Sequence, residues 1–411
     1  MSLESSVCKI SGGRYKSSVN LPYSKSYANR LLILGSISPD LFEITNVALS
    51  SDVITLIEIL KEIGLDIRVE NNKISIHNSF PACEKLTDQT VLLETKDGGT
   101  TNRFLACLLL LGKNCYELIS THKFKERPND EFIKQLKHLK VEHNIPKKDD
   151  RFWVRLKGPI QAEKNILEID CSETTQFYTG FKLLESETNL KVRSLNLKTS
   201  QGYASITDKI IVDYKNGDRH FRIPIDFSSA SYPIVFGSIN QDLIINNCVA
   251  IDNSQPDSVL IELINSIGGS VKVTKKGLEI EKSKLLPFDL DCSGCPDLVP
   301  ALVYLACHIN GVSFIRNINV LRHKESDRIE AVLSVISQAS GKAAYNESND
   351  ILSVFGPIVI KEKINFQLPP DHRMIMLASL LLRSSGTSGS VDNAMHVKKS
   401  YPDFFRDLLD E

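Results

Sequence analysis

The sequence DVITLIEILKEIG at residues 52–64 is the clearest indication of the fold, because its pattern occurs six times along the chain. In each run an aspartate precedes apolar residues at helical spacing, and several runs, this one included, end at a glycine, which is typical of an amphipathic helix with an acidic start. Similar runs begin at Asp130, Asp208, Asp257, Asp327 and Asp403, and the first three runs start 78 residues apart. The pattern predicts six helices that begin at or near these aspartates.

A second set of segments alternates with these runs. Each segment begins with small polar residues and becomes strongly apolar, which predicts a buried helix; the segments are 24–37, 98–112, 173–184, 228–239, 295–307 and 370–382. Strand-like stretches lie between them at 65–77, 269–282 and 343–356, the last two with hairpin-like turns. The alternation predicts an α/β protein of six units, each with two helices and several strands, and three units in each of two domains.

Length and charge restrict the class of protein. The chain has 411 residues, too many for one compact core and suitable for two domains. Its 49 Lys and Arg residues balance 50 Asp and Glu residues, which disfavours a protein that coats nucleic acid or an anionic membrane. A nucleic-acid-binding or scaffolding repeat protein is also disfavoured by the clustering of Arg and Lys at helix starts.

The sequence also indicates where the protein works. The longest apolar runs, such as 104–111 and 374–382, are shorter than the ~18 residues that a membrane span needs, and no secretory signal pattern is visible. Nine cysteines, an odd number, fit reduced thiols better than a disulfide framework. We therefore expect a soluble, cytoplasmic protein that does not bind a membrane.

The polar starts of the second set of segments point to an anionic ligand. The first turn of a helix exposes unpaired backbone N–H groups and a partial positive charge. Several such helix starts around one cleft would favour a polyanionic small molecule, especially one that carries phosphate. Because helix dipoles alone stabilise an anion only weakly, fixed charges and an acid/base pair are expected nearby.

Three charged motifs lie in the first half of the chain: LPYSKSYANR at 21–30, KDGGTTNR at 96–103 and KERP at 125–128. In the first, Arg30 follows Ser26 by four residues on one helix face, close to Lys25. In the second, paired glycines let a ligand approach the backbone closely. In the third, Pro128 biases Arg127 toward an extended backbone, so we expect a loop to present Arg127. Taken alone, each motif is also compatible with solvated surface charge or an ordinary turn.

Two more charged motifs lie in the second half, RHKESDRIEA at 322–331 and PPDHRM at 369–374. In the first, Lys324 and Arg328 are expected to share a helix face at i, i+4 spacing, with Glu325 turned away from it. A carboxylate held between cations can serve as an acid/base, although the same residues could form a solvated helix face. The second motif leads directly into an apolar helix, which favours a functional role.

These motifs occur in one order over nearly the whole chain, together with TTQF at 174–177 and KSYPDF at 399–404. In this the sequence resembles the 5-enolpyruvylshikimate-3-phosphate (EPSP) synthase family. The resemblance implies the two-domain enolpyruvyl transferase fold, with three βαβαββ-type repeats in each domain and helices that face a central cleft. It implies a discontinuous domain I of residues 1–22 and 227–411, and a domain II of residues 23–226, with the active site in the cleft between them.

The resemblance also implies the reaction. The enolpyruvyl group of phosphoenolpyruvate is transferred to the 5-hydroxyl of shikimate 3-phosphate by addition and elimination, and phosphate is released. This chemistry requires no cofactor, no metal and no nucleophilic residue. Cys292 and Cys295 form a C-x-x-C pair, but no second pair follows at zinc-like spacing, so we assign no metal site. The implied partners are the two small-molecule substrates, with no nucleic acid, and the implied state is a monomer.

The resemblance assigns roles to matching residues. The catalytic residues it implies are Lys25, Asp297 and Glu325, with Asp297 as the group that deprotonates the 5-hydroxyl and Glu325 as an acid/base at the methylene carbon. The residues implied to bind shikimate 3-phosphate are Lys25, Ser26, Arg30, Thr174, Thr175, Gln176, Ser200, Tyr203, Asp297 and Lys324. The residues implied to bind phosphoenolpyruvate are Lys25, Gly99, Arg127, Gln176, Arg328, Arg373 and Lys399.

The chain departs from the family pattern at Asp97, Phe104 and Val320, where Asn, Pro and Asn are usual.

The nearest alternative is the related enolpyruvyl transferase that acts on UDP-N-acetylglucosamine. That enzyme typically pairs its early Lys with Asn and carries a cysteine in a loop. Here Ser26 follows Lys25 and the loop position holds KERP, which favours the EPSP synthase interpretation.

Overall fold

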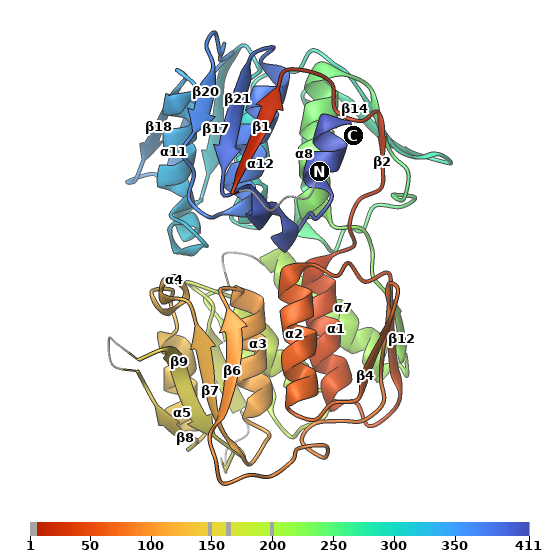
Figure 1. The fold of residues 1–411 in the computed structure, drawn as a ribbon, viewed down its shortest axis with the longest axis vertical. Coiled ribbons are helices and arrows are strands. Elements are labelled where there is room, and N and C mark those ends of the chain that lie inside the picture. The colour runs from red at the N-terminus through yellow and green to blue at the C-terminus, as the bar shows by residue number, and fades with distance from the viewer. Residues whose placement is uncertain (1–5, 147–149, 162–165, 198–200, 411) are drawn as a thin grey trace. The chain divides into compact units, whose positions relative to one another are not determined.

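The computed structural model describes residues 6–146, 150–161, 166–197 and 201–410. The chain divides into two compact units (Figure 1). Unit 1 consists of Met1–Pro22 and Ile225–Glu411, and unit 2 consists of Tyr23–Pro224. Each unit is described below by itself.

Unit 2 contains layers of helix and sheet. Its helices are α1 (Lys25–Ile37), α2 (Ser51–Glu62), α3 (Gly99–Leu109), α4 (His122–Lys125), α5 (Asp130–His138), α6 (Gln176–Leu184) and α7 (Gln201–Lys215). Its strands are β3 (Phe42–Thr45), β4 (Ile67–Glu70), β5 (Lys73–Ile76), β6 (Val91–Lys96), β7 (Cys115–Ser120), β8 (Glu142–Asn144), β9 (Phe152–Lys157), β10 (Ile166–Asp170), β11 (Lys191–Leu195) and β12 (His220–Arg222). The strands form sheets in the orders β12-β3-β5-β4, β6-β7-β9-β8 and β10-β11.

Unit 1 repeats this arrangement. Its helices are α8 (Phe227–Asn240), α9 (Val259–Ser266), α10 (Val299–Ala306), α11 (Arg328–Gln338), α12 (His372–Ser384) and α13 (Phe404–Leu409), with 3-10 turns η1 (Pro256–Ser258), η2 (Pro296–Leu298), η3 (Asn319–His323) and η4 (Ala394–Lys399). Its strands are β1 (Val7–Ser11), β2 (Ser18–Val19), β13 (Leu243–Ile245), β14 (Ser270–Thr274), β15 (Gly277–Glu281), β16 (Asp289–Asp291), β17 (Gly311–Arg316), β18 (Lys342–Asn346), β19 (Ile351–Gly356), β20 (Ile364–Phe366) and β21 (Ser388–Asp392). The sheets have the orders β14-β15-β13-β2, β16-β17-β19-β18 and β1-β21-β20.

One strand pairing recurs in every four-stranded sheet. In the sheet of β6, β7, β9 and β8, β6 and β7 run parallel, whereas β7–β9 and β8–β9 are antiparallel. The sheet of β16, β17, β19 and β18 has the same parallel pair and antiparallel hairpin. Two βαβαββ units can be followed along the chain: β6-α3-β7-α5-β8-β9 and β16-α10-β17-α11-β18-β19. The first has the additional short helix α4 after β7, and the second has the 3-10 turn η3 after β17. The predicted α/β class is therefore confirmed.

The six aspartate-led runs are helical, with one difference in where a helix begins. Asp327 caps α11 by accepting from the backbone N–H groups of Ile329 and Glu330. The prediction that a helix begins near Asp208 was wrong, because Asp208 lies in the middle of α7, which begins at Gln201. The buried residues of α7 recur at helical spacing on both sides of Asp208, whose own side chain is exposed.

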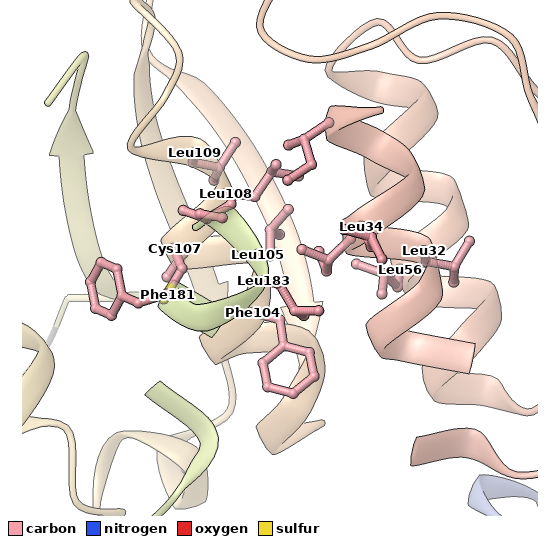
Figure 2. Packing of buried hydrophobic residues seen from close by; sticks show 14 of the residues in the cluster. Leu32, Leu34, Leu56, Phe104, Leu105, Cys107, Leu108, Leu109, Phe181 and Leu183 are labelled. Carbon is pink, nitrogen blue, oxygen red and sulfur yellow. The ribbon is translucent and has the colours of Figure 1, made fainter. Parts of the chain in front are cut away.

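A hydrophobic core joins α1, α2, α3 and α6 in unit 2 (Figure 2). Helices α3 and α6 approach closely at Gly180, where an added Cβ would lie 2.7 Å from the Cys107 sulfur. This close packing fixes the start of α3 relative to the start of α6, where several predicted site residues lie. Among the described residues, no helix combines the length and the apolar character that crossing a bilayer would require.

Candidate active site

The start of α1 carries an ion pair. Lys25, the first residue of the helix, lies with its Nζ 2.9 Å from Oδ2 of Asp52 in α2, and the two side chains are 20% and 8% exposed. Asp52 lies in the first turn of α2, the helix that covers most of residues 52–64 of the repeated pattern. The same residue therefore provides the acidic helix start and pairs with the predicted catalytic lysine. A partly buried pair of this kind restricts where the ammonium group can lie.

Arg30 connects α1 with α7. Its guanidinium donates to the backbone oxygens of Ser26 and Tyr203, each at 2.8 Å, and to the hydroxyl of Thr207 at 2.9 Å. It also lies over the ring of Phe104, 5.5 Å from the centroid. Burial lowers the pKa of Arg30 to about 10, so the side chain remains charged at neutral pH. The structure thus brings Arg30 together with Ser26 and Tyr203.

The starts of α3 and α6 meet beside Arg127. Gly99 is the first residue of α3 and Gln176 the first residue of α6. A Cβ on Gly99 would lie 2.9 Å from Nη1 of Arg127 and 3.0 Å from Oε1 of Gln176. Arg127 follows α4 in the loop that leads to α5, as the sequence predicted. Three predicted phosphoenolpyruvate ligands are therefore neighbours within unit 2.

Three more predicted residues of unit 2 lie beside helix starts. Thr174 and Thr175 immediately precede α6, and the Thr174 hydroxyl accepts from the Gln176 backbone N–H at 3.3 Å. Tyr203 lies in the first turn of α7. Ser200 lies outside the described residues.

In unit 1, Asp297 is surrounded by cations. It lies in η2 ahead of α10, and its carboxylate is 2.9 Å from Nη1 of Arg328, 3.1 Å from Nη2 of Arg373 and 3.3 Å from Nζ of Lys324. Arg373 also donates to the Asp297 backbone oxygen at 2.9 Å. Burial acts to raise the pKa of Asp297, but the charges of Arg373, Lys324 and Arg328 together hold it well below its usual value.

Arg328 is the most buried of these cations, with a side chain 1% exposed. Besides Asp297 it donates to Glu325 Oε2 at 2.6 Å and to Asp371 Oδ2 at 2.8 Å. Although burial acts to lower its pKa, the charges of Asp371, Glu325 and Asp297 raise it, so Arg328 is fully charged. Lys399 completes the cluster, with its Nζ 3.8 Å from Oε1 of Glu325.

The expected shared helix face of Lys324 and Arg328 was wrong. Asp327 caps α11, so the helix begins at Arg328, and Lys324 has an extended backbone at the end of η3. Both side chains nevertheless reach the same oxygen of Asp297. Tertiary contacts, rather than helical spacing, bring them together.

Sequence reasoning gave no role to several residues that hold the site. Asp52 pairs with Lys25, Thr207 accepts from Arg30, and Asp371 pairs with Arg328. Arg103 of α3 donates to Gln176. Asp371 and Arg103 both belong to motifs quoted above, but neither motif shows which distant residue its charged side chain meets.

Comparison with solved structures first defines the class. The chain matches the EPSP synthase from Acinetobacter baumannii with a TM-score of 0.75 at 18% identity, covering 98% of this chain and 97% of that one. It matches the enolpyruvyl transferase NikO from Streptomyces tendae with a TM-score of 0.75 at 14% identity, covering 98% and 96%. The fold is therefore that of the enolpyruvyl transferases.

Sequence comparison narrows this class. The family model described as EPSP synthase (3-phosphoshikimate 1-carboxyvinyltransferase) matches residues 10–408. The 3-phosphoshikimate 1-carboxyvinyltransferase of Pyrococcus abyssi is 28% identical over 408 residues, covering 95% of this chain and 93% of the relative. The enzyme of the same name from Clostridium novyi is 27% identical over 425 residues, covering 97% and 96%. The chain belongs to the EPSP synthase family.

Proposed function

We propose that this protein transfers the enolpyruvyl group of phosphoenolpyruvate to the 5-hydroxyl of shikimate 3-phosphate and releases phosphate. The observation that carries the proposal is the cluster in which Arg328, Arg373 and Lys324 surround the Asp297 carboxylate, in a chain of the EPSP synthase family. Both substrates are anions, and the predicted cations provide the fixed charges that bind them.

In the proposed mechanism, Asp297 accepts the proton of the 5-hydroxyl as its oxygen attacks the central carbon of phosphoenolpyruvate. Glu325, with Lys25, delivers a proton to the methylene carbon, which gives a tetrahedral ketal. Removal of a proton from the resulting methyl group then expels phosphate. General acid/base groups of this kind each contribute roughly 10²–10⁴-fold to the rate.

The ion pairs of the cluster supply a reason for substrate-dependent activation. Without substrate, Arg373, Lys324 and Arg328 hold the pKa of Asp297 well below its usual value, so its carboxylate is a weak base. A substrate phosphate or carboxylate that binds these cations competes with Asp297 for them. The basicity of Asp297 then rises when both substrates are present, and the proton transfer is confined to the loaded enzyme.

We also propose that the active site forms between the two units. The predicted site residues divide between them: Lys25, Gly99 and Arg127 belong to unit 2, whereas Asp297 and Glu325 belong to unit 1. Neither unit alone carries both the proposed acid/base groups and the complete set of phosphoenolpyruvate ligands. The proposed domains are residues 1–22 with 227–411, and residues 23–226. We further propose that the protein is a cytoplasmic monomer that does not bind nucleic acid.

The test is phosphate release from phosphoenolpyruvate with shikimate 3-phosphate, run beside UDP-N-acetylglucosamine as the acceptor. We expect release only with shikimate 3-phosphate, and release only with the nucleotide sugar would contradict the proposal. Glu325→Gln should retain binding of both substrates and lower kcat by about 10²-fold or more. Glu330→Gln, at an exposed position of α11 five residues further along the chain, is the matched control and should keep normal turnover.

A further inference from the structure

Arg103 is a buried cation in α3 that the proposed mechanism does not use. The residue is only 2% exposed, and its guanidinium carbon lies over two aromatic rings. The centroid of Phe177 is 5.1 Å away and that of Phe124 is 5.5 Å away. Two such cation–π contacts restrict where the planar guanidinium can lie more tightly than they would restrict a lysine ammonium.

The edge of the same guanidinium meets two segments of the candidate site. Nη1 donates to Oε1 of Gln176 at 2.8 Å and to the hydroxyl of Thr174 at 3.2 Å. Nη2 donates to the backbone oxygen of Pro128 at 2.7 Å, and Nη2 and Nε both lie 3.4 Å from Oδ1 of Asn129. One side chain therefore ties the start of α6 to the loop that carries Arg127.

The bond to Gln176 sets the orientation of its amide. A guanidinium can only donate, so the amide atom that faces Arg103 has to be the oxygen. The NH2 group of Gln176 then lies on the opposite side of the amide, where it can donate to an oxygen of an anionic substrate. Without Arg103, both orientations of the amide would be open, and one of them would present an oxygen to the anion.

Arg103 also affects the position of Arg127. The ring of Phe124 lies under both guanidinium groups, 5.5 Å from Arg103 and 5.8 Å from Arg127. The Pro128 carbonyl, one residue after Arg127, is held by Arg103. The hydrogen bond from Arg103 to the Pro128 carbonyl therefore helps to fix the backbone at Arg127, and with it the direction of the Arg127 side chain.

We infer that Arg103 is a positioning residue for phosphoenolpyruvate binding, which acts by orienting the Gln176 amide and the Arg127 loop. The inference rests on the proposed function, because it assigns these two groups to an anionic substrate. Arg103 itself is covered by Phe124, Phe177 and its hydrogen-bond partners, and its effect on the substrate passes through Gln176 and Arg127.

A double-mutant cycle tests the inference, with kcat and KM measured for wild type, Arg103→Lys, Gln176→Ala and the double variant. Arg103→Lys keeps the charge but loses the forked set of N–H donors and the planar group that lies over the two rings. We expect it to raise KM for phosphoenolpyruvate so that kcat/KM falls about tenfold to a hundredfold. In the Gln176→Ala background, Arg103→Lys should lower kcat/KM by no more than about threefold, because the Gln176 amide that Arg103 orients is already absent.

Several outcomes separate positioning from a merely structural role. Loss of folded protein would lower kcat and leave KM unchanged, which would overturn the inference, as would an equal factor in both backgrounds. Arg155→Lys is the matched control, since Arg155 also lies over a phenylalanine ring, that of Phe152 at 5.1 Å, but pairs with Glu117, which has no proposed role. It should keep the wild-type KM.

A second variant covers the case in which Arg103→Lys does not fold. Phe124→Leu removes the ring shared by Arg103 and Arg127 and leaves both charges in place, so KM for phosphoenolpyruvate should rise at least about threefold. An unchanged KM in a folded Phe124→Leu protein would overturn the inference. An inactive wild-type chain would overturn the proposed function together with this inference, whereas an active wild type with additive variants would overturn the inference alone.

Discussion

Arg328 donates from Nε to Oδ2 of Asp371 at 2.8 Å, and the two side chains are 1% and 0% exposed. Asp371 also accepts from the hydroxyl of Ser326 at 3.0 Å and from the backbone N–H of Arg373 at 3.0 Å. Its charge therefore balances a buried guanidinium while its position caps α12, which carries Arg373. One carboxylate thus fixes two of the cations that surround Asp297.

Replacement of Asp371 tests this relationship. Asp371→Asn keeps the shape and can still cap the helix, but it removes the charge that faces Arg328. We expect the free energy of unfolding to fall by roughly 3–5 kcal/mol, the usual range when one partner of a buried pair is lost. Urea denaturation followed by circular dichroism measures the change. Phosphate release by the folded fraction should also show a raised KM for phosphoenolpyruvate, since Arg328 loses one of its three carboxylate partners.

The exposed pair of Asp289 and Arg316 is the control, with side chains 49% and 39% exposed. Its carboxylate lies in a strand of the same unit, and water solvates both charges. Asp289→Asn should change stability much less than Asp371→Asn. Equal losses in the two variants would show that burial of the Arg328 pair has no special effect.

Asp257 should make stability depend on pH. Burial raises its pKa to about 7; Arg373 and the Ser228 hydroxyl act to lower the pKa, whereas Asp297 and Asp226 act to raise it. In the unfolded chain an aspartate loses its proton near pH 4. Between these values the folded state binds more protons, so the contribution of this group to stability falls as pH rises through that window.

Asp257→Asn imitates the protonated side chain at every pH. We therefore expect the unfolding free energy of the variant, relative to wild type, to rise by about 2 kcal/mol between pH 5 and pH 8. Urea titrations at both pH values measure the difference. A difference that stays constant between the two pH values would refute the prediction.

The helical repeat was readable from the sequence because burial imposes a period. Runs such as 52–64 alternate with the apolar segments, and the structure has helices in both sets. The exact residue at which a helix begins was harder to predict. Asp208 lies inside α7, whereas the side chain of Asp327 caps the start of α11. Motif order also identified most of the charged residues that the structure places near one another within each unit.

The partners of those residues could not be read in the same way. Arg328 and Asp371 are 43 residues apart, and Arg103 and Gln176 are 73 apart. Such pairs follow from how helices pack, which depends on contacts such as the close approach at Gly180 rather than on local spacing. The sequence therefore predicted several of the charged side chains that lie together within each unit, while the structure shows which carboxylate or amide each cation holds.

Gly99 provides the most direct test of the geometry in unit 2, because its missing side chain makes room for two proposed ligands. An alanine Cβ would lie 2.9 Å from Nη1 of Arg127 and 3.0 Å from Oε1 of Gln176, so both flexible side chains would have to move. Since a helix start tolerates alanine, Gly99→Ala should change the free energy of unfolding by less than about 1 kcal/mol. KM for phosphoenolpyruvate should rise about tenfold or more, with a smaller change in KM for shikimate 3-phosphate.

Gly294→Ala, where an added Cβ meets nothing within 4 Å, is the control for adding a methyl group. An unaltered KM for phosphoenolpyruvate in Gly99→Ala would mean that neither Arg127 nor Gln176 contacts this substrate from the position seen here.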